Sequence, residues 1–235
     1  MVGETEVSRR NGAPQKLART FPLAILLSCT GGYLDAFTWV GHGGVFANAQ
    51  TGNVVLLGIN AATGQWSEAV RHLMPIVAFI FGVFAAFWVR NLASARGEPW
   101  INLISLLLEL AVLIIVAFLP TGFPSMAIVL AISFVASVQS SIFTKLGKWP
   151  YNSVIATGNL RRATESLIRG VSRHRDTSDL EQSKKFGAVS LSFLAGAGLG
   201  AVATNFLGNA ATAGAAVLLT FSLMLCLHTG TQVGN

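Results

Sequence analysis

Apolar residues are gathered into long stretches along this chain, with few polar positions inside them. Each of these stretches is about 20 residues long, which an α-helix needs to cross the hydrocarbon core of a bilayer. The pattern therefore predicts an all-α polytopic membrane protein with six transmembrane helices. The six segments are Phe21–Val40, Leu73–Asn91, Ile101–Leu119, Ser125–Phe143, Phe186–Phe206 and Ala210–His228.

Two further segments are ambiguous. Residues 45–62 are apolar but are interrupted by three amide side chains and a glycine between positions 48 and 53. Residues 151–170 begin apolar and become basic and amphipathic after Asn159. From hydropathy alone, either segment can be a seventh span, a re-entrant segment or an interfacial turn.

Composition supports a membrane protein over a soluble one. Of the 235 residues, 52% are hydrophobic and only 11% are charged, whereas a soluble domain has about 25% charged residues. The net charge of +6 would suggest nucleic acid for a soluble protein. Here the basic residues lie between apolar segments, so we expect the lipid bilayer and not nucleic acid to be their partner.

The positions of the basic residues predict the topology. If neither ambiguous segment crosses the membrane, all of the 16 Lys and Arg residues except Arg71 lie on the side of the N-terminal tail. That side should be the cytoplasm. We therefore expect residues 1–20 to be a cytoplasmic tail, 21–228 a single membrane domain, and 145–185 a basic cytoplasmic segment within it. The first span has no obvious cleavage site and is expected to be retained.

An internal repeat is visible in the chain. The tripeptide TGN occurs at Thr51–Asn53 and again at Thr157–Asn159, 106 residues later, with matching residues before it. Each half, about 21–119 and about 125–228, has three spans, so the two halves must be inserted in opposite directions. Inverted repeats with interrupted segments near the midplane are typical of secondary transporters. We therefore expect two inverted three-helix repeats, each with a broken, re-entrant TGN segment. Capped interfacial turns without a ligand remain the alternative.

The motifs GGYLDAF at Gly31–Phe37 and GGVFANAQTGN at Gly43–Asn53, followed by VVLLG, resemble the YoaK family. This family consists of small bacterial integral membrane proteins assigned to a domain of unknown function. The resemblance extends over nearly the whole chain. It implies a multi-pass protein of the bacterial inner membrane, and it brings no catalytic residues with it.

Two acidic residues lie within predicted spans. Glu109 is near the centre of the third span, where a carboxylate is costly and marks a functional site by default. The alternative is a protonated residue that packs between helices. Asp35 follows Gly31–Gly32, a pair that can kink or break a helix. It can bind a cation or proton, or cap the broken end.

The predicted lining of a solute or ion site contains these two acids, the polar residues of the TGN segments and one amide of the fourth span. It suits a small polar solute or an ion. These residues are Asp35, Asn48, Gln50, Thr51, Gly52, Asn53, Glu109, Gln139, Thr157, Gly158 and Asn159.

Motifs for catalysis or metal binding are missing from the sequence, which contains no GxSxG, HExxH, Walker or dinucleotide motif and no Cys/His metal spacing. We expect no enzyme, cofactor or metal. The leading hypothesis is a secondary transporter or permease, coupled to a proton or cation. A passive channel and a non-transporting scaffold or sensor are the alternatives. The glycines Gly196 and Gly200 allow close helix packing within the chain or between copies, so a homo-oligomer stays open.

Overall fold

The computed structural model describes residues 20–94, 100–154, 156–172 and 177–231. The predicted cytoplasmic tail therefore lies almost entirely outside the described residues. The described part is helical apart from one short two-stranded hairpin. Its elements are α2 (Phe21–Gly41), α3 (Gln50–Ala62), α4 (Trp66–Ser94), α5 (Ile101–Ala117), α6 (Ser125–Ile142), β1 (Lys145–Leu146), β2 (Trp149–Pro150), α7 (Ala156–Ser172), α8 (Thr177–Leu207), the 3₁₀ turn η1 (Gly208–Ala211) and α9 (Thr212–Thr231).

All six predicted spans are helical, as α2, α4, α5, α6, α8 and α9. Four stretches of the described chain are long and apolar enough to cross a membrane: Phe21–Gly41, Trp66–Leu92, Ser125–Ile142 and Thr177–Leu227. The last of them contains α8, η1 and most of α9. The remaining predicted span, α5, is a shorter apolar helix of 17 residues.

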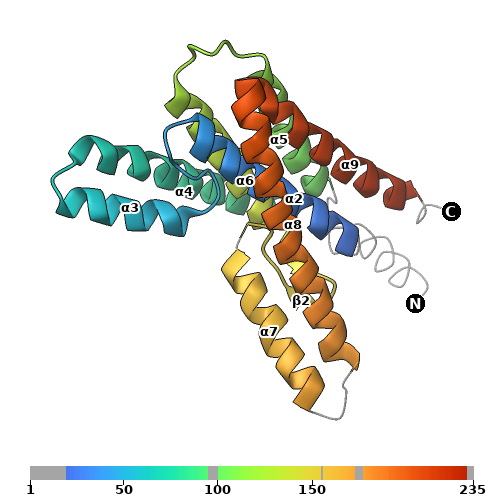
Figure 1. The fold of residues 1–235 in the computed structure, drawn as a ribbon. Coiled ribbons are helices and arrows are strands. Elements are labelled where there is room, and N and C mark those ends of the chain that lie inside the picture. Colours follow the sequence, from blue (N-terminus) through green and yellow to red (C-terminus); the bar gives the residue numbers. More distant parts are fainter. Residues whose placement is uncertain (1–19, 95–99, 155, 173–176, 232–235) are drawn as a thin grey trace.

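The helices pair across the sequence. Helix α2 packs along α8, and α4 packs along α6, while α5 packs against both α6 and α9. Helix α3 lies beside α4, and α7 lies beside α8. The pair α3–α4 and the pair formed by α7 with the first half of α8 extend in different directions from the centre, where α2, α6 and α8 meet (Figure 1).

Glycines allow the two largest helix contacts. A Cβ atom on Gly196 of α8 would lie 2.0 Å from the carbonyl oxygen of Cys29 in α2. A Cβ atom on Gly82 of α4 would lie 1.8 Å from Ser137 Oγ and 2.4 Å from the carbonyl oxygen of Phe134 in α6. Backbones can approach this closely only where no side chain intervenes. The surface formed by Gly196 and Gly200 thus packs within the chain.

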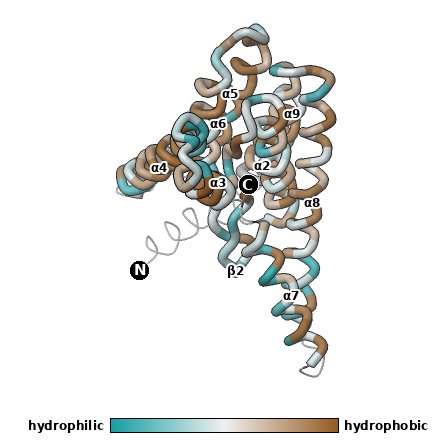
Figure 2. Tube along the Cα trace, turned by 60° about the vertical axis from the view of Figure 1, so that its left-hand side comes forward, coloured by the Kyte–Doolittle hydropathy of each residue, from teal (hydrophilic) through white to brown (hydrophobic). Residues whose placement is uncertain are grey.

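The apolar core lies between α2, α5, α6 and α9, and includes Leu34, Phe37, Leu106 and Ile132. The outward side of α4 is also apolar, with Phe81, Phe84, Phe87 and Trp88 all exposed. Figure 2 shows apolar colour along α4, α5 and α9, whereas polar colour gathers near β2 and along α7. Such an outer surface fits contact with lipid better than contact with water.

Candidate functional site

Each TGN tripeptide lies in the first turn of a helix. Helix α3 begins at Gln50, directly before Thr51, and α7 begins at Ala156, directly before Thr157. In both copies the threonine is exposed, the glycine is half-buried and the asparagine is buried. The interruption predicted in each segment is therefore a loop followed by a new helix, and neither threonine faces the interior.

The buried asparagines tie each loop to the helix that follows it. Asn53 accepts a hydrogen bond from Phe46 N at 3.0 Å and donates one to Phe46 O at 2.7 Å. Asn159 donates to Asn152 O at 2.8 Å, again to the residue seven positions earlier. Backbone groups of a buried loop need such partners, because an unpaired one costs about as much as a lost hydrogen bond.

The neighbouring side chains of the first TGN segment extend this network. Asn53 Nδ2 also donates to Gln50 Oε1 at 2.8 Å, and Gln50 Nε2 donates to Ala47 O at 2.8 Å. Gly52 leaves room for the ring of Phe46, which a Cβ atom there would meet at 2.7 Å. Gln50 and Gly52 thus shape the loop, and no solute contact is needed to explain them.

Asp35 binds the first loop from α2. Its Oδ1 accepts hydrogen bonds from Asn48 N at 2.7 Å and Ala49 N at 3.3 Å, directly before α3. The positive end of the α3 dipole favours a carboxylate here. Asn48 Nδ2 in turn donates to Gly31 O at 3.2 Å.

The second loop reaches the same part of α2. Ser28 Oγ donates to Ser153 O at 2.8 Å, and a Cβ atom on Gly31 would meet Val154 Cγ1 at 3.1 Å. Ser153 Oγ donates to Gln139 Oε1 on α6 at 3.4 Å. The two loops therefore meet along about two turns of α2, at a place that we call the loop junction. It consists of Ser28, Gly31, Asp35, Asn48, Ser153 and Val154.

Sequence reasoning missed part of this junction. Ser28, Ser153 and Tyr151 were not predicted to take part, although the last two lie in the second ambiguous segment, a few residues before Thr157. The OH of Tyr151 donates to Ala24 O at 2.8 Å, and burial raises the pKa of this phenol above its ordinary value. The pair Gly31–Gly32, which can break or kink a helix, does not break α2, because the helix runs through both residues. The absence of side chains there admits Val154 and α8 instead.

Two buried oxygens of the junction have no hydrogen-bond partner among the residues that the structure describes. They are Asp35 Oδ2 and Asn48 Oδ1, and both residues are only 4% exposed. Asn159 Oδ1 is unpartnered as well. A buried polar atom without a partner costs about 1–3 kcal/mol, so each one requires an explanation such as a bound ligand.

Glu109 lies apart from this junction. It is 1% exposed on the buried side of α5, next to Leu106 and Leu113, which belong to the apolar core. Helix α5 packs on α6 and α9, whereas the loops bind α2. Glu109 Oε2 has no hydrogen-bond partner in the described part of the chain. The structure thus joins Asp35 to Asn48, but it does not join Glu109 to either.

No group of three or more His, Cys, Asp or Glu side chains that could hold a metal occurs among the described residues.

Long apolar helices around a buried polar junction define a multi-pass membrane protein. Residues 23–225 match the family described as Protein of unknown function (DUF1275), and the chain belongs to this family. It is 27% identical over 150 residues to the UPF0700 transmembrane protein YoaK of Bacillus subtilis (strain 168). That alignment covers 62% of this chain and 66% of the relative, just under two thirds of its length. No solved structure matches the chain. The resemblance expected from the GGYLDAF and QTGN motifs is confirmed.

Proposed function

We propose that this protein is a secondary transporter or permease of the bacterial inner membrane for a small polar solute or ion, coupled to a proton or cation. One observation carries the proposal. Two loops from different halves of the chain meet at one part of α2, where Asp35 Oδ2 and Asn48 Oδ1 are buried without partners. Ionisable groups inside a membrane domain usually mark an ion or substrate path. The proposal assigns no catalytic residue.

We propose further that residues of about 21–119 and about 125–228 are inverted repeats with re-entrant loops. The pairing of helices supports this. In such a repeat, helices α2, α3, α4 and α5 correspond to α6, α7, α8 and α9, in this order. The contact of α2 with α8 then has its counterpart in the contact of α6 with α4. The contact of α5 with α6 likewise has its counterpart in the contact of α9 with α2. The same correspondence relates α3–α4 to α7–α8. A two-fold axis between the halves produces this pattern, as in transporters that open alternately to the two sides.

The hydrogen bonds support the same relation. Asn53 binds Phe46 and Asn159 binds Asn152, each at seven residues' distance. Gly82 and Gly196 each lie against the backbone of the first helix of the other half. With three crossings per half, the two loops would enter from opposite faces of the membrane and end at the junction.

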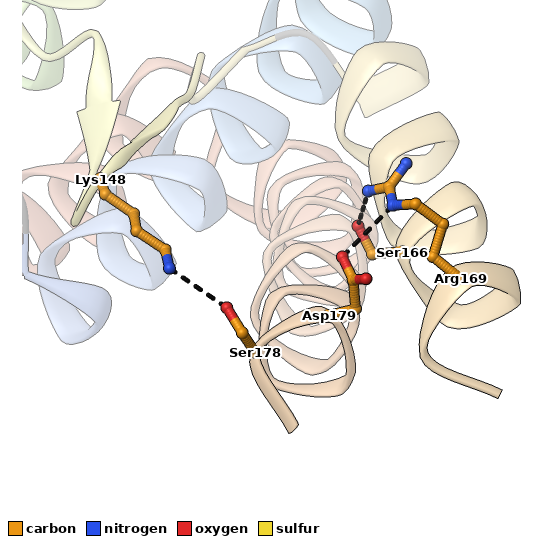
Figure 3. Close-up of polar contacts among 5 residues, drawn as sticks. All are labelled: Lys148, Ser166, Arg169, Ser178 and Asp179. Atoms are coloured by element: carbon orange, nitrogen blue, oxygen red, sulfur yellow. Dashed lines mark hydrogen bonds and ion pairs between the residues drawn. The ribbon is translucent and has the colours of Figure 1, made fainter. Parts of the chain in front are cut away.

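We place the basic segment 145–185 and both termini in the cytoplasm. Charged contacts of the start of α8 with α7 and with the turn between β1 and β2 fit an aqueous setting (Figure 3). Lys148 Nζ donates to Ser178 Oγ at 3.1 Å, and Arg169 binds Asp179 at 3.2 Å and Ser166 at 3.0 Å. Single cysteines at Ser178 and at Gln65, in a chain without its two native cysteines, test this in intact cells. A membrane-impermeant maleimide should label position 65 and not position 178. The reverse result would overturn the orientation.

The transport proposal is tested with proteoliposomes and a panel of small solutes and ions. Flux should saturate, should depend on a proton or sodium gradient, and should be lost in Asp35→Asn and reduced in Glu109→Gln. The exposed Glu181→Gln serves as a matched control that keeps full flux. Unsaturable flux without coupling would indicate a channel. If nothing moves, and Asp35→Asn and Glu109→Gln leave the cellular phenotype unchanged, the transport proposal is wrong and a scaffold or sensor remains.

A further inference from the structure

We infer that the loop junction binds one singly charged cation, such as a proton, an alkali ion or ammonium, between Asp35 and Asn48, and that it excludes anions. This inference deepens the proposed function and rests on it. It concerns the chemical class of the ligand, which the proposal for transport leaves open.

The buried junction atoms that lack a partner among the described residues are both hydrogen-bond acceptors. Asn48 Nδ2 donates to Gly31 O, so the amide cannot turn without placing its oxygen against a carbonyl oxygen. The same holds for Asn159, whose Nδ2 donates to Asn152 O. Each amide nitrogen thus has an acceptor, whereas Asn48 Oδ1 and Asp35 Oδ2 in the junction, and Asn159 Oδ1 in α7, lack a partner among the described residues. A ligand that satisfies them must carry positive charge or donate hydrogen bonds.

An anion has no comparable partner here. The N–H groups before α3, which could attract an anion, already bind Asp35 Oδ1. None of the ion pairs in the described part of the chain includes Asp35. The carboxylate is thus offset by backbone dipoles and the amide of Asn48 and by no positively charged side chain in the described part of the chain, so a second negative charge beside it would be repelled.

The two halves of the chain differ at the positions of Asp35 and Asn48. The residues that correspond to Asp35 and Asn48 in the second half are Ser141 and Val154. Val154 is apolar and fills the space beside Gly31. The cation site therefore occurs once in each chain, and we expect one bound ion per chain.

The substitution Asp35→Asn should imitate the occupied site. Its oxygen can still accept from Asn48 N and Ala49 N, and its new amide nitrogen can donate to Asn48 Oδ1. The purified protein is unfolded thermally in detergent at constant ionic strength, in sodium, potassium, ammonium or N-methylglucamine chloride, and in sodium phosphate. One small cation should raise the unfolding midpoint of the wild type whichever anion is present. Asp35→Asn should not respond to it, and should unfold at or above the midpoint of the wild type without the ion.

A proton as the ligand gives a different result in the same assay. The midpoint of the wild type then rises as pH falls from 8 to 5, without preference among metal ions, and that of Asp35→Asn rises less, because only the buried acid Glu109 remains. The other titratable side chains of α2 and the two loops are Cys29, Tyr33, His42 and Tyr151. Only His42 titrates in this range, and His42→Gln should keep the pH response.

Control variants and a second measurement distinguish a failure of the cation-binding inference from a failure of the transport proposal. Glu181→Gln removes an exposed acid outside the junction and should keep the cation response. Binding of radioactive sodium to the wild type and to Asn48→Ser gives a second measurement, in which loss of Asn48 Oδ1 should weaken binding about tenfold or more. Stabilisation by an anion, or a cation response that persists in Asp35→Asn, overturns the inference even if solutes are transported. Cation binding without flux supports the inference and overturns transport.

Discussion

Replacing Gly196 by alanine tests the contact between α2 and α8 on which the fold depends. A Cβ atom there would lie 2.0 Å from the carbonyl oxygen of Cys29 and 2.9 Å from its Cα atom. Gly198, two residues further along the same helix, has nothing within 4 Å of the corresponding position. The two substitutions therefore make the same chemical change in one helix, but only the first meets another backbone.

The expected effects have opposite signs. Alanine is favoured over glycine within a helix by about 0.5–1 kcal/mol, so Gly198→Ala should stabilise the protein slightly. Ordinary contacts are 3.4–4 Å, so Gly196→Ala must move α2 and α8 apart by more than 1 Å. Overpacking of this kind costs about 1–3 kcal/mol or more. The two variants should differ by about 2–4 kcal/mol, which is about 5–15 °C in unfolding midpoint for a chain of this size.

The assay is thermal unfolding in detergent, followed by circular dichroism of the helix signal. Gly32→Ala offers a second test from the α2 side, since its Cβ atom would lie 2.0 Å from Phe193 O, and it should lose a similar amount. Equal midpoints for Gly196→Ala and Gly198→Ala would show that α2 and α8 do not approach each other at this point, and the reasoning would be refuted.

Three further predictions concern hydrogen bonds around the loops. Asn53→Leu leaves both backbone groups of Phe46 without a partner and should cost about 2–4 kcal/mol in chemical unfolding, whereas exposed Thr51→Ala should change stability by less than about 0.5 kcal/mol. Tyr33→Phe removes the 2.7 Å bond from its OH to Ala211 O and should cost about 0.5–1.5 kcal/mol; an unchanged midpoint would speak against that contact. Burial raises the pKa of Tyr151 above its ordinary value of 10.0, so the folded state holds this proton to higher pH than the unfolded state. The stability that the protonated phenol contributes is therefore complete below pH 10 and declines above it. In chemical unfolding between pH 10 and 12, Tyr151→Phe should lose less stability than the wild type.

Most of the secondary structure could be predicted from hydropathy. The six apolar segments lie in helices, because the length of an apolar run is a local property, but α4 begins seven residues and α8 nine residues before the predicted span. The first predicted span, Phe21–Val40, differs from α2 by one residue at its end. The pairing of helices could not be predicted in this way, because apolar residues at the surface of a span suit lipid and protein equally well.

The candidate site was predicted only in outline. Asp35, Asn48 and the asparagines of the TGN segments are buried as expected for a polar site. Whether Asp35 caps a helix or binds an ion was open in the sequence, and the structure shows that one of its oxygens caps the loop while the other has no partner. Thr51 and Thr157 share the motif but lie on the exposed side of their helices, since successive helical residues point in different directions.

Apolar length was enough to identify a membrane protein and the segments that form its long helices, because transfer into lipid depends mainly on the residues of each segment alone. The repeated tripeptide located the two TGN segments. The meeting of the two loops at Gly31, the separation of Glu109 from Asp35 and the one unpartnered oxygen on each of Asp35 and Asn48 were decided only by the tertiary structure. Whether a polar atom in a membrane domain caps a helix, packs between helices or binds a ligand depends on the atoms that fold against it. Those atoms can be distant in sequence, as Val154 is from Gly31.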